Sequence, residues 1–248
     1  MRFFFYTNNM KEFINHPLSD KCIALTTTTS LGNLAYQVDD GKGVKERRNL
    51  LSSLLNVPIE RFTYVHQHHS DKVMKVTPNE LGRGKDIFED GLESDALYTY
   101  EKNAPICVFH ADCVPIFFIN EKANLVGIIH AGFKGTMKHV TLKVMNEIIN
   151  NEKLNIKDFL FYIGPYREPI SFEIDDMMRN TVTEAGFKAA IKGNRFDNGL
   201  ANIIDLHEVG VNDSQIKAIH LDTVTDDRLY SAYQKTPVGR LVSLIYLK

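Results

Sequence analysis

Three neighbouring segments dense in valine, isoleucine and phenylalanine constrain the fold of this chain more than any other feature. They cover residues 105–109, 114–120 and 124–130. Runs of β-branched and aromatic residues of this length predict buried strands. Directly afterwards the apolar period changes, because Val140, Val144 and Ile148 recur four residues apart within 136–150. This period predicts an amphipathic helix, so the centre of the chain is expected to form a sheet covered by a helix.

Further strands and helices are expected on both sides of this block. Strands are predicted at 61–65, 73–77, 95–100, 159–163, 217–224 and 241–247. Helices are predicted at 45–55, 174–185 and within 203–209. Because strands and helices do not alternate cleanly, we expect an α+β fold with mixed β-sheets flanked by helices. Glycine and proline are spread without a linker, so a single domain over residues 1–248 is expected.

Composition narrows the class of protein. The formal net charge is −2 at pH 7, which gives no field that would favour nucleic acid as a partner. No apolar run approaches the roughly 18 residues of a membrane span, and the apolar patch at 3–6 lacks the features of a signal peptide. Three cysteines are too few for a disulfide framework and suit a reducing compartment. We therefore expect a soluble cytoplasmic protein that binds no nucleic acid and no membrane; its oligomeric state has no signal in the sequence.

Three segments place polar residues where a predicted strand runs into a loop. They read His66-Gln67-His68-His69-Ser70, His110-Ala111-Asp112-Cys113-Val114-Pro115 and His130-Ala131-Gly132-Phe133-Lys134-Gly135. Catalytic zinc typically takes three protein ligands and keeps a fourth position for water. His69, Cys113 and His130 would supply two nitrogens and one thiolate from three strand ends. The sequence therefore predicts a His–Cys–His metal site.

The third segment also suggests an anion site. Gly132 and Gly135 stand in a strand–turn–helix connection whose exposed N–H groups would suit a phosphate or carboxylate, and Lys134 would add charge. The alternative is a tight connection in which the glycines only let the chain turn.

Other polar and sulfur-bearing residues near these segments have simpler interpretations. Cys22 and Cys107 are expected to be small apolar core residues. In an extended chain His66 and His68 share one face, and we expect them to be surface histidines. Asp112 precedes Cys113 and is a candidate to orient a ligand histidine or to transfer a proton.

Taken together, the three segments resemble the YfiH-like family, also called the laccase-domain or peptidoglycan-editing-factor family. That family carries Gln-x-His-Gly, Ala-Asp-Cys-x-Pro and His-Ala-Gly-Trp-Arg-Gly stretches, which match the stretches beginning at Gln67, Ala111 and His130 here. Further matches follow in order along the chain at Gly32-Asn33, Ser94-Asp95-Ala96, Ile163-Gly164-Pro165 and Gly239-Arg240. Lysine, phenylalanine and serine replace the family's arginine, tryptophan and glycine at positions 134, 133 and 70.

The resemblance implies a fold, an activity and a set of site residues. The fold is the one that the family shares with a toxin using a Cys–His pair. The implied activity is zinc-dependent phosphorolysis of adenosine, inosine or methylthioadenosine, together with adenosine deamination; a separate implied role is hydrolytic editing of a peptidoglycan precursor. The partners are thus a purine nucleoside and phosphate. The implied catalytic residues are Cys113, His130, Asp112 and Lys134, and the implied substrate-binding residues are Asn33, Gln67, Lys134 and Gly135.

Two alternatives use the same residues differently. Cys113 could be a nucleophile with His130 as its base, as in cysteine hydrolases. The triad could instead be a closed structural zinc site with His110 or Asp71 as fourth ligand.

A copper oxidase is a third alternative, suggested by the family's laccase label. Multicopper oxidases need repeated His-x-His pairs, and this chain has nine histidines with one such pair, His66 and His68. The sequence therefore does not favour laccase activity, although His and Cys ligands can take up copper adventitiously.

Overall fold

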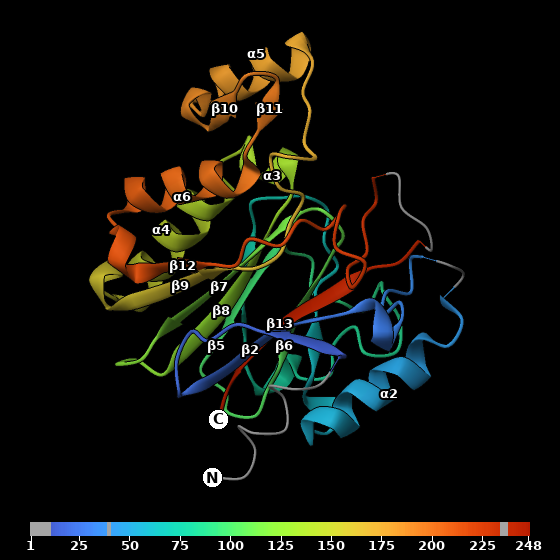
Figure 1. Cartoon of the computed structure of the whole chain (residues 1–248). Helices are drawn as coiled ribbons and strands as arrows, with labels where there is room; N and C mark the ends of the chain where they lie inside the picture. The colour runs from blue at the N-terminus through green and yellow to red at the C-terminus, as the bar shows by residue number, and fades with distance from the viewer. Residues whose placement is uncertain (1–10, 39–40, 234–237) are drawn as a thin grey trace.

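The structure is a computed structural model that describes residues 11–38, 41–233 and 238–248. Its centre is a pair of mixed β-sheets (Figure 1). The five-stranded sheet has the order β1 (Phe13–Asn15), β2 (Cys22–Thr27), β13 (Leu241–Leu247), β6 (Ile106–His110) and β3 (Thr63–Tyr64). The six-stranded sheet has the order β12 (Ile216–Ala218), β9 (Phe159–Ile163), β7 (Val114–Asn120), β8 (Leu125–Ala131), β5 (Ala96–Thr99) and β4 (Val73–Val76).

The two sheets pack face to face around the main core. Phe117 of β7 and Ile128 of β8 join one apolar cluster with Val108 of β6 and Leu244 of β13. The alternate residues of β7 and β8 point to the other side, as expected for strands. Both strands are buried on both faces, which explains why their sequences are continuous apolar runs.

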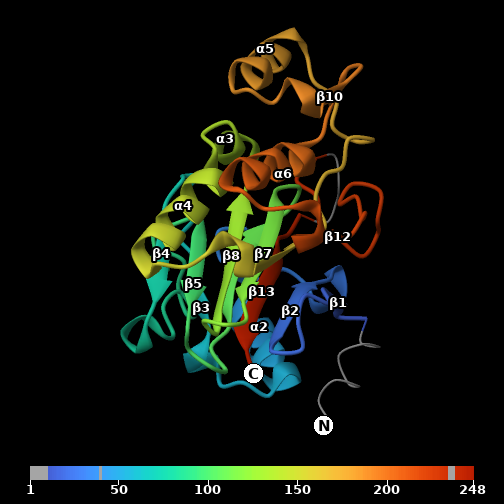
Figure 2. The same cartoon turned by 90° about the vertical axis from the view of Figure 1, so that its left-hand side faces the viewer.

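Helices cover the outer face of the six-stranded sheet. The helices α4 (Val140–Glu152) and α6 (Asn198–Val209) lie across that face in Figure 2, and their apolar residues share a cluster with β7 and β8.

The helix α2 (Val44–Leu55) packs elsewhere and contributes Leu51 and Leu55 to the core between the sheets. Apolar residues spaced along one side of each helix supply this packing.

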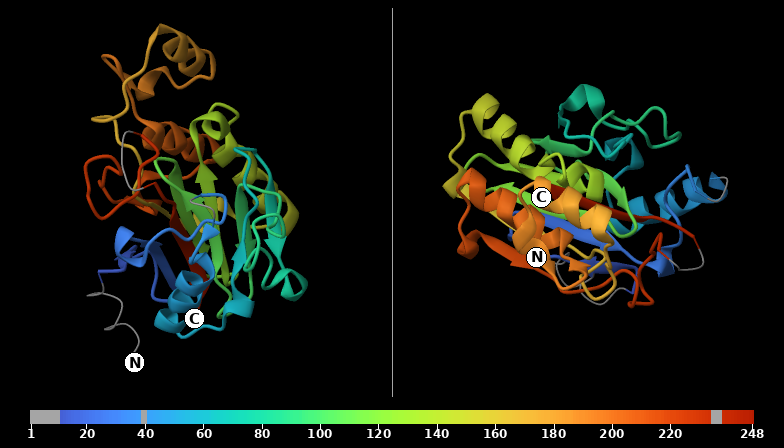
Figure 3. Two further views of the ribbon diagram at one scale, coloured as in Figure 1. Left: turned by 90° about the vertical axis from the view of Figure 1, so that its right-hand side faces the viewer. Right: turned by 90° about the horizontal axis from the view of Figure 1, so that it is seen from above.

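A smaller unit lies above the sheets, beyond α3 (Phe133–Thr136) and α6 (Figures 1 and 3). It contains α5 (Asp176–Glu184) and the hairpin of β10 (Ile191–Lys192) and β11 (Arg195–Phe196). Its own apolar cluster is built around Phe187 and Phe196.

The predicted fold class is confirmed, because mixed sheets are flanked by helices. The strands predicted at 114–120, 159–163 and 241–247 have the predicted bounds, and no described helix is long and apolar enough to span a membrane. The apolar patch at 3–6 lies outside the described residues. A single domain over 1–248 stays a prediction.

Three predictions of secondary structure need correction, and several short strands were not predicted. The helix predicted at 136–150 is broken into α3 and α4, because His139 takes a left-handed conformation with φ of 59°. The strand predicted at 217–224 ends at Ala218, and the one at 61–65 is reduced to two residues after a 3₁₀ turn. Strands β1, β2, β10 and β11 were not predicted; β1 has only three residues, and β10 and β11 have two each.

Candidate metal centre

The three predicted ligands meet at one end of the sandwich, near α3. His69 lies in the loop between β3 and β4, Cys113 directly precedes β7, and His130 lies near the end of β8. One ligand atom from each residue lies within 4.8 Å of the other two, and Cys113 Sγ is 3.7 Å from His69 Nε2. Tetrahedral zinc with ordinary Zn–N and Zn–S bonds holds such atoms about 3.5 Å apart. The donor set therefore fits a metal ion of this kind.

The register of β7 and β8 produces this meeting. Their antiparallel pairing sets Val114 opposite Ala131, so Cys113 and Gly132 lie side by side just outside the sheet. A Cβ atom on Gly132 would stand 2.3 Å from His69 Cδ2 and 2.9 Å from Cys113 Sγ. Both contacts are closer than packed atoms tolerate, so glycine at this position leaves the room that two ligands occupy.

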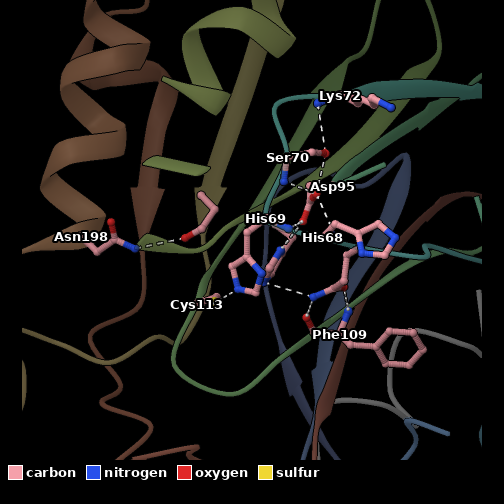
Figure 4. Close-up of polar contacts among 11 residues, drawn as sticks. His68, His69, Ser70, Lys72, Asp95, Phe109, Cys113 and Asn198 are labelled. Carbon is pink, nitrogen blue, oxygen red and sulfur yellow. Dashed lines mark hydrogen bonds and ion pairs between the residues drawn. The ribbon is translucent and has the colours of Figure 1, made fainter. Parts of the chain in front are cut away.

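Asp95, just before β5, ties two ligands together (Figure 4). Its Oδ1 lies 2.8 Å from His130 Nδ1 and accepts the N–H of His69 at 3.0 Å. Its Oδ2 accepts the N–H groups of His68 (3.2 Å) and Ser70 (2.6 Å) and the Ser70 hydroxyl. His69 has a φ of 56°, a region that is costly for a residue other than glycine. The hydrogen bonds to Asp95 stabilise this conformation.

The carboxylate also fixes which nitrogen of His130 is available. Because Nδ1 is engaged by Asp95, Nε2 faces the other ligands, and such a carboxylate–histidine pair is typical behind metal-binding histidines. Asp95 is completely buried. Burial raises the pKa of Asp95, but the hydrogen bond and charge of His130, together with the hydrogen bonds of Ser70, outweigh burial and hold that pKa well below its usual range.

The electrostatics favour a thiolate. Burial raises the pKa of Cys113, but the charge and hydrogen bond of His130, followed by those of His69, lower it to about 6. Burial likewise lowers the pKa of His130, whereas Cys113 and Asp95 raise it to about 9. A thiolate is the form of cysteine that binds metals and attacks electrophiles, so the site has this form near neutral pH.

Gln67 lies at the same site. Its side-chain amide pairs with the backbone of Phe109, accepting the N–H at 2.9 Å and donating to the carbonyl at 2.7 Å. The same amide nitrogen stands 3.2 Å from His130 Nε2. Gln67 is therefore held beside the donor atoms, where a bound molecule would meet it.

The predicted anion-binding turn has a different shape from the one expected. Lys134 is exposed and Gly135 is buried, but both lie within the single turn of α3, and the long helix begins only at Val140. The expected N-terminal end of a long helix is thus absent from residues 132–136. The roles of Lys134 and Gly135 in substrate binding stay predictions.

Asn33, a predicted substrate-binding residue, is held by contacts within the protein. Asn33 is buried, and its side chain donates to the carbonyls of Ala35 and Val38 and accepts the N–H groups of Ala35 and Arg240. The side-chain amide of Asn33 is thus fully engaged within the protein, which disfavours the predicted contact with substrate.

The Asp112 carboxylate accepts hydrogen bonds from the Thr223 hydroxyl (2.7 Å) and the Ala232 N–H (2.9 Å). Neither contact is to a ligand histidine, whereas Asp95 Oδ1 lies 2.8 Å from His130 Nδ1, so orienting His130 falls to Asp95 and not to Asp112. Asp95 was missed as a functional residue, although the Ser94-Asp95-Ala96 match had marked its position.

Neither proposed fourth ligand joins the site. His110 Nε2 is 2.8 Å from the Ser243 hydroxyl, and Asp71 forms an ion pair with Lys143 at 2.6 Å. In the described part of the chain, the metal-type cluster at this site consists of His69, Cys113 and His130. A metal ion held by these three residues alone would keep a coordination position open, as catalytic zinc sites do and structural zinc sites do not.

The fold and site define a class: an α+β protein of two packed mixed sheets with a His–Cys–His metal-type centre at the strand ends. The family model described as multi-copper polyphenol oxidoreductase laccase matches residues 25–248. The chain belongs to this family, as the sequence resemblance had indicated.

Individual relatives agree with this assignment. A purine nucleoside phosphorylase of Staphylococcus saprophyticus is 30% identical over 224 residues, 86% of this chain and 84% of the relative. The purine nucleoside phosphorylase YlmD of Bacillus subtilis is 28% identical over 229 residues, 88% of this chain and 82% of the relative.

Solved structures match the fold. The hypothetical protein YfiH of Bacillus licheniformis has a TM-score of 0.88 at 24% identity, covering 97% of this chain and 98% of that one. YlmD from Geobacillus stearothermophilus has a TM-score of 0.82 at 24% identity, covering 92% and 93%.

Proposed function

We propose that this chain is a zinc-dependent purine nucleoside phosphorylase. The observation that carries the proposal is the three-ligand His–Cys–His centre with an open position, braced by Asp95. The names of the curated relatives supply the substrate class. When bound, zinc would supply a Lewis acid and lower the pKa of a water molecule toward neutrality.

The chain's own residues would bind and orient the reactants. Phosphorolysis joins a phosphate oxygen to the ribose carbon as the bond from that carbon to the purine nitrogen breaks, and the purine leaves with a proton. Lys134, exposed next to the site, is proposed to attract the phosphate. Lysine gives charge without the planar fork of arginine, so phosphate would be held less rigidly than by the family's arginine.

Gln67 and Asp112 are proposed to act on the nucleoside side. The amide of Gln67 is fixed by Phe109 and can hydrogen-bond a purine or ribose group. Asp112, which directly precedes Cys113, is proposed to carry a proton. Its carboxylate is held by Thr223 and Ala232, which keeps it in one position.

Deamination of adenosine is proposed as a second activity of the same centre. Water would add to the ring carbon that carries the amino group, and ammonia would leave to give inosine, which needs the same ligands but no phosphate. The test is to incubate the zinc-loaded protein with adenosine, in phosphate and in a phosphate-free buffer. Adenine and ribose 1-phosphate that form only with phosphate would support phosphorolysis, and inosine formed in both buffers would support deamination. Equal adenine release in both buffers would contradict phosphorolysis.

A cysteine hydrolase is the second candidate function, and one observation favours it. Cys113, His130 and Asp95 form the order of nucleophile, base and orienting carboxylate that activates a cysteine. His69, 3.7 Å from Cys113 Sγ, is a second imidazole that this scheme does not require and that a metal would take as a ligand. Activity that survives complete removal of metal, and that is lost on alkylation of Cys113, would favour the hydrolase.

Peptidoglycan-precursor editing is a further proposed use of the centre, and copper in place of zinc would be adventitious. We also propose a cytoplasmic location, since all three cysteines are free, and small molecules rather than nucleic acid as partners.

A further inference from the structure

A second cluster of metal-type ligands lies beside the first. His66, His68 and Glu93 each offer one ligand atom, and these atoms lie within 4.8 Å of one another. His68 and Glu93 are exposed and His66 is partly buried.

The backbone holds the cluster together. The N–H of His66 donates to the Leu92 carbonyl at 2.7 Å, and the N–H of Leu92 donates to the Tyr64 carbonyl at 3.0 Å. These bonds place Glu93 next to His66. Gly91 permits the approach, since a Cβ atom there would lie 2.8 Å from the His66 nitrogen. The glycine thus allows two chain segments to run in contact where the three side chains meet.

The side chains are also positioned by their neighbours. The ring centroids of His66 and His68 are 4.3 Å apart, and the edge of His66 packs against Phe88 at the same centroid distance. The N–H of His68 donates to Asp95, the carboxylate that braces the first centre. Within the described ranges, no hydrogen bond or ion pair involves the side chain of His66, His68 or Glu93.

We infer that His66, His68 and Glu93 form a second, exposed binding site for a divalent late first-row transition metal such as Zn²⁺ or Ni²⁺. Two imidazoles and one carboxylate are a recurrent protein ligand set for such ions, and the remaining positions are filled by water. The site lacks a thiolate and faces solvent, so it binds metal more weakly than the centre at Cys113. Since it rests on other residues, its existence does not depend on the proposed phosphorylase activity.

The test measures metal stoichiometry and not activity. Equilibrium dialysis of the full chain against Zn²⁺, followed by elemental analysis, is expected to show a tight and a weaker equivalent in the wild type. The Cys113→Ala variant is expected to keep only the weaker one. Adding His68→Ala or Glu93→Gln to Cys113→Ala should remove that equivalent too.

A matched control is available at another exposed histidine. His207 pairs with Asp213 at 2.8 Å, and neither belongs to a metal-type cluster among the described residues, so His207→Gln should leave both equivalents in place. Co²⁺ gives an independent readout: the weaker equivalent should show no thiolate-to-metal charge-transfer band, whereas the tight one should show it.

The Glu93→Gln change is at an exposed residue and preserves side-chain shape, so unfolding would not explain a loss. The inference is overturned if the wild type has no second equivalent, or if His68→Ala and Glu93→Gln both retain it. It is equally overturned if His207→Gln removes it.

Discussion

Asp95 Oδ1 lies 2.8 Å from His130 Nδ1, and the same carboxylate accepts the backbone N–H of His69. One fully buried side chain thus orients two of the three ligands of the His–Cys–His centre. Cys113, from a different strand end, completes the set. The geometry of the centre therefore depends on a residue that would not itself touch the metal.

Replacing Asp95 with asparagine should weaken zinc binding. The amide nitrogen of asparagine cannot accept the N–H of Ser70, so the turn around His69 would lose a bond that the carboxylate provides. Loss of such a supporting group typically lowers metal affinity about 10–100-fold. Competition with a chromophoric chelator would measure this, with Asp71→Asn, at a partly exposed residue outside the site, as control. Unchanged affinity in Asp95→Asn would refute the bracing role.

Gly132→Ala and Gly135→Ala should differ sharply in how much zinc they retain. A Cβ atom at Gly132 would stand 2.3 Å from His69, whereas one at Gly135 would have its nearest neighbour, the Ser70 carbonyl oxygen, at 3.4 Å. We expect Gly132→Ala to lose tight zinc and Gly135→Ala to keep it. Elemental analysis of both purified variants checks this. Equal zinc content in the two variants would show that zinc binding does not depend on the close packing of His69 against Gly132.

Lys134→Ala should raise the KM for phosphate with a smaller change in the KM for nucleoside. A hydrogen bond to a charged group contributes about 1.5–3 kcal/mol, which corresponds to at least about a tenfold effect. Lys134→Arg, which keeps the positive charge, should keep the KM for phosphate low. Lys138→Ala, at another exposed lysine nearby, is the control. If Lys134→Ala and Lys138→Ala behave alike, Lys134 does not bind phosphate.

Stability should fall as the pH drops below about 6.5. His16 and His110 are buried and hydrogen-bond the hydroxyls of Thr26 and Ser243, respectively. Burial lowers the pKa of each histidine to about 3. Between these pH values the unfolded chain binds protons that the folded chain does not. Each histidine then adds a slope of about 1.4 kcal/mol per pH unit to the free energy of unfolding.

Denaturant unfolding between about pH 7.5 and about pH 5 measures this slope. His16→Gln should make the slope shallower, whereas His220→Gln, whose side chain is 84% exposed, should not. A slope that His16→Gln leaves unchanged would contradict the assignment.

The sequence predicted the ligands better than it predicted their support. His69, Cys113 and His130 stand out because their residue types are unusual at strand ends. The contacts of Asn33 and Asp112 depend on Arg240 and Ala232, more than a hundred positions away along the chain, and no local pattern reports such pairs. The helix break at His139 was missed for another reason: the apolar period of the sequence continues through it.

The strands were also predicted with uneven success. Strands buried on both faces, such as β7 and β13, have continuous apolar sequences and were predicted with correct bounds. The three-residue β1 forms because β2 offers it an edge to pair with, and β12 is short because it has one partner, β9, among the described strands. Pairing at an edge leaves little trace in composition.

Metal content tested together with activity addresses the central claim most directly. The protein would be dialysed against a weak chelator to empty exposed sites, and then assayed for zinc and for adenine release from adenosine and phosphate. Wild type and Cys107→Ala should retain about one zinc per chain and release adenine, and Cys113→Ala should lose both. A metal-free wild type that still released adenine, or a Cys113→Ala variant that kept zinc and activity, would contradict the account.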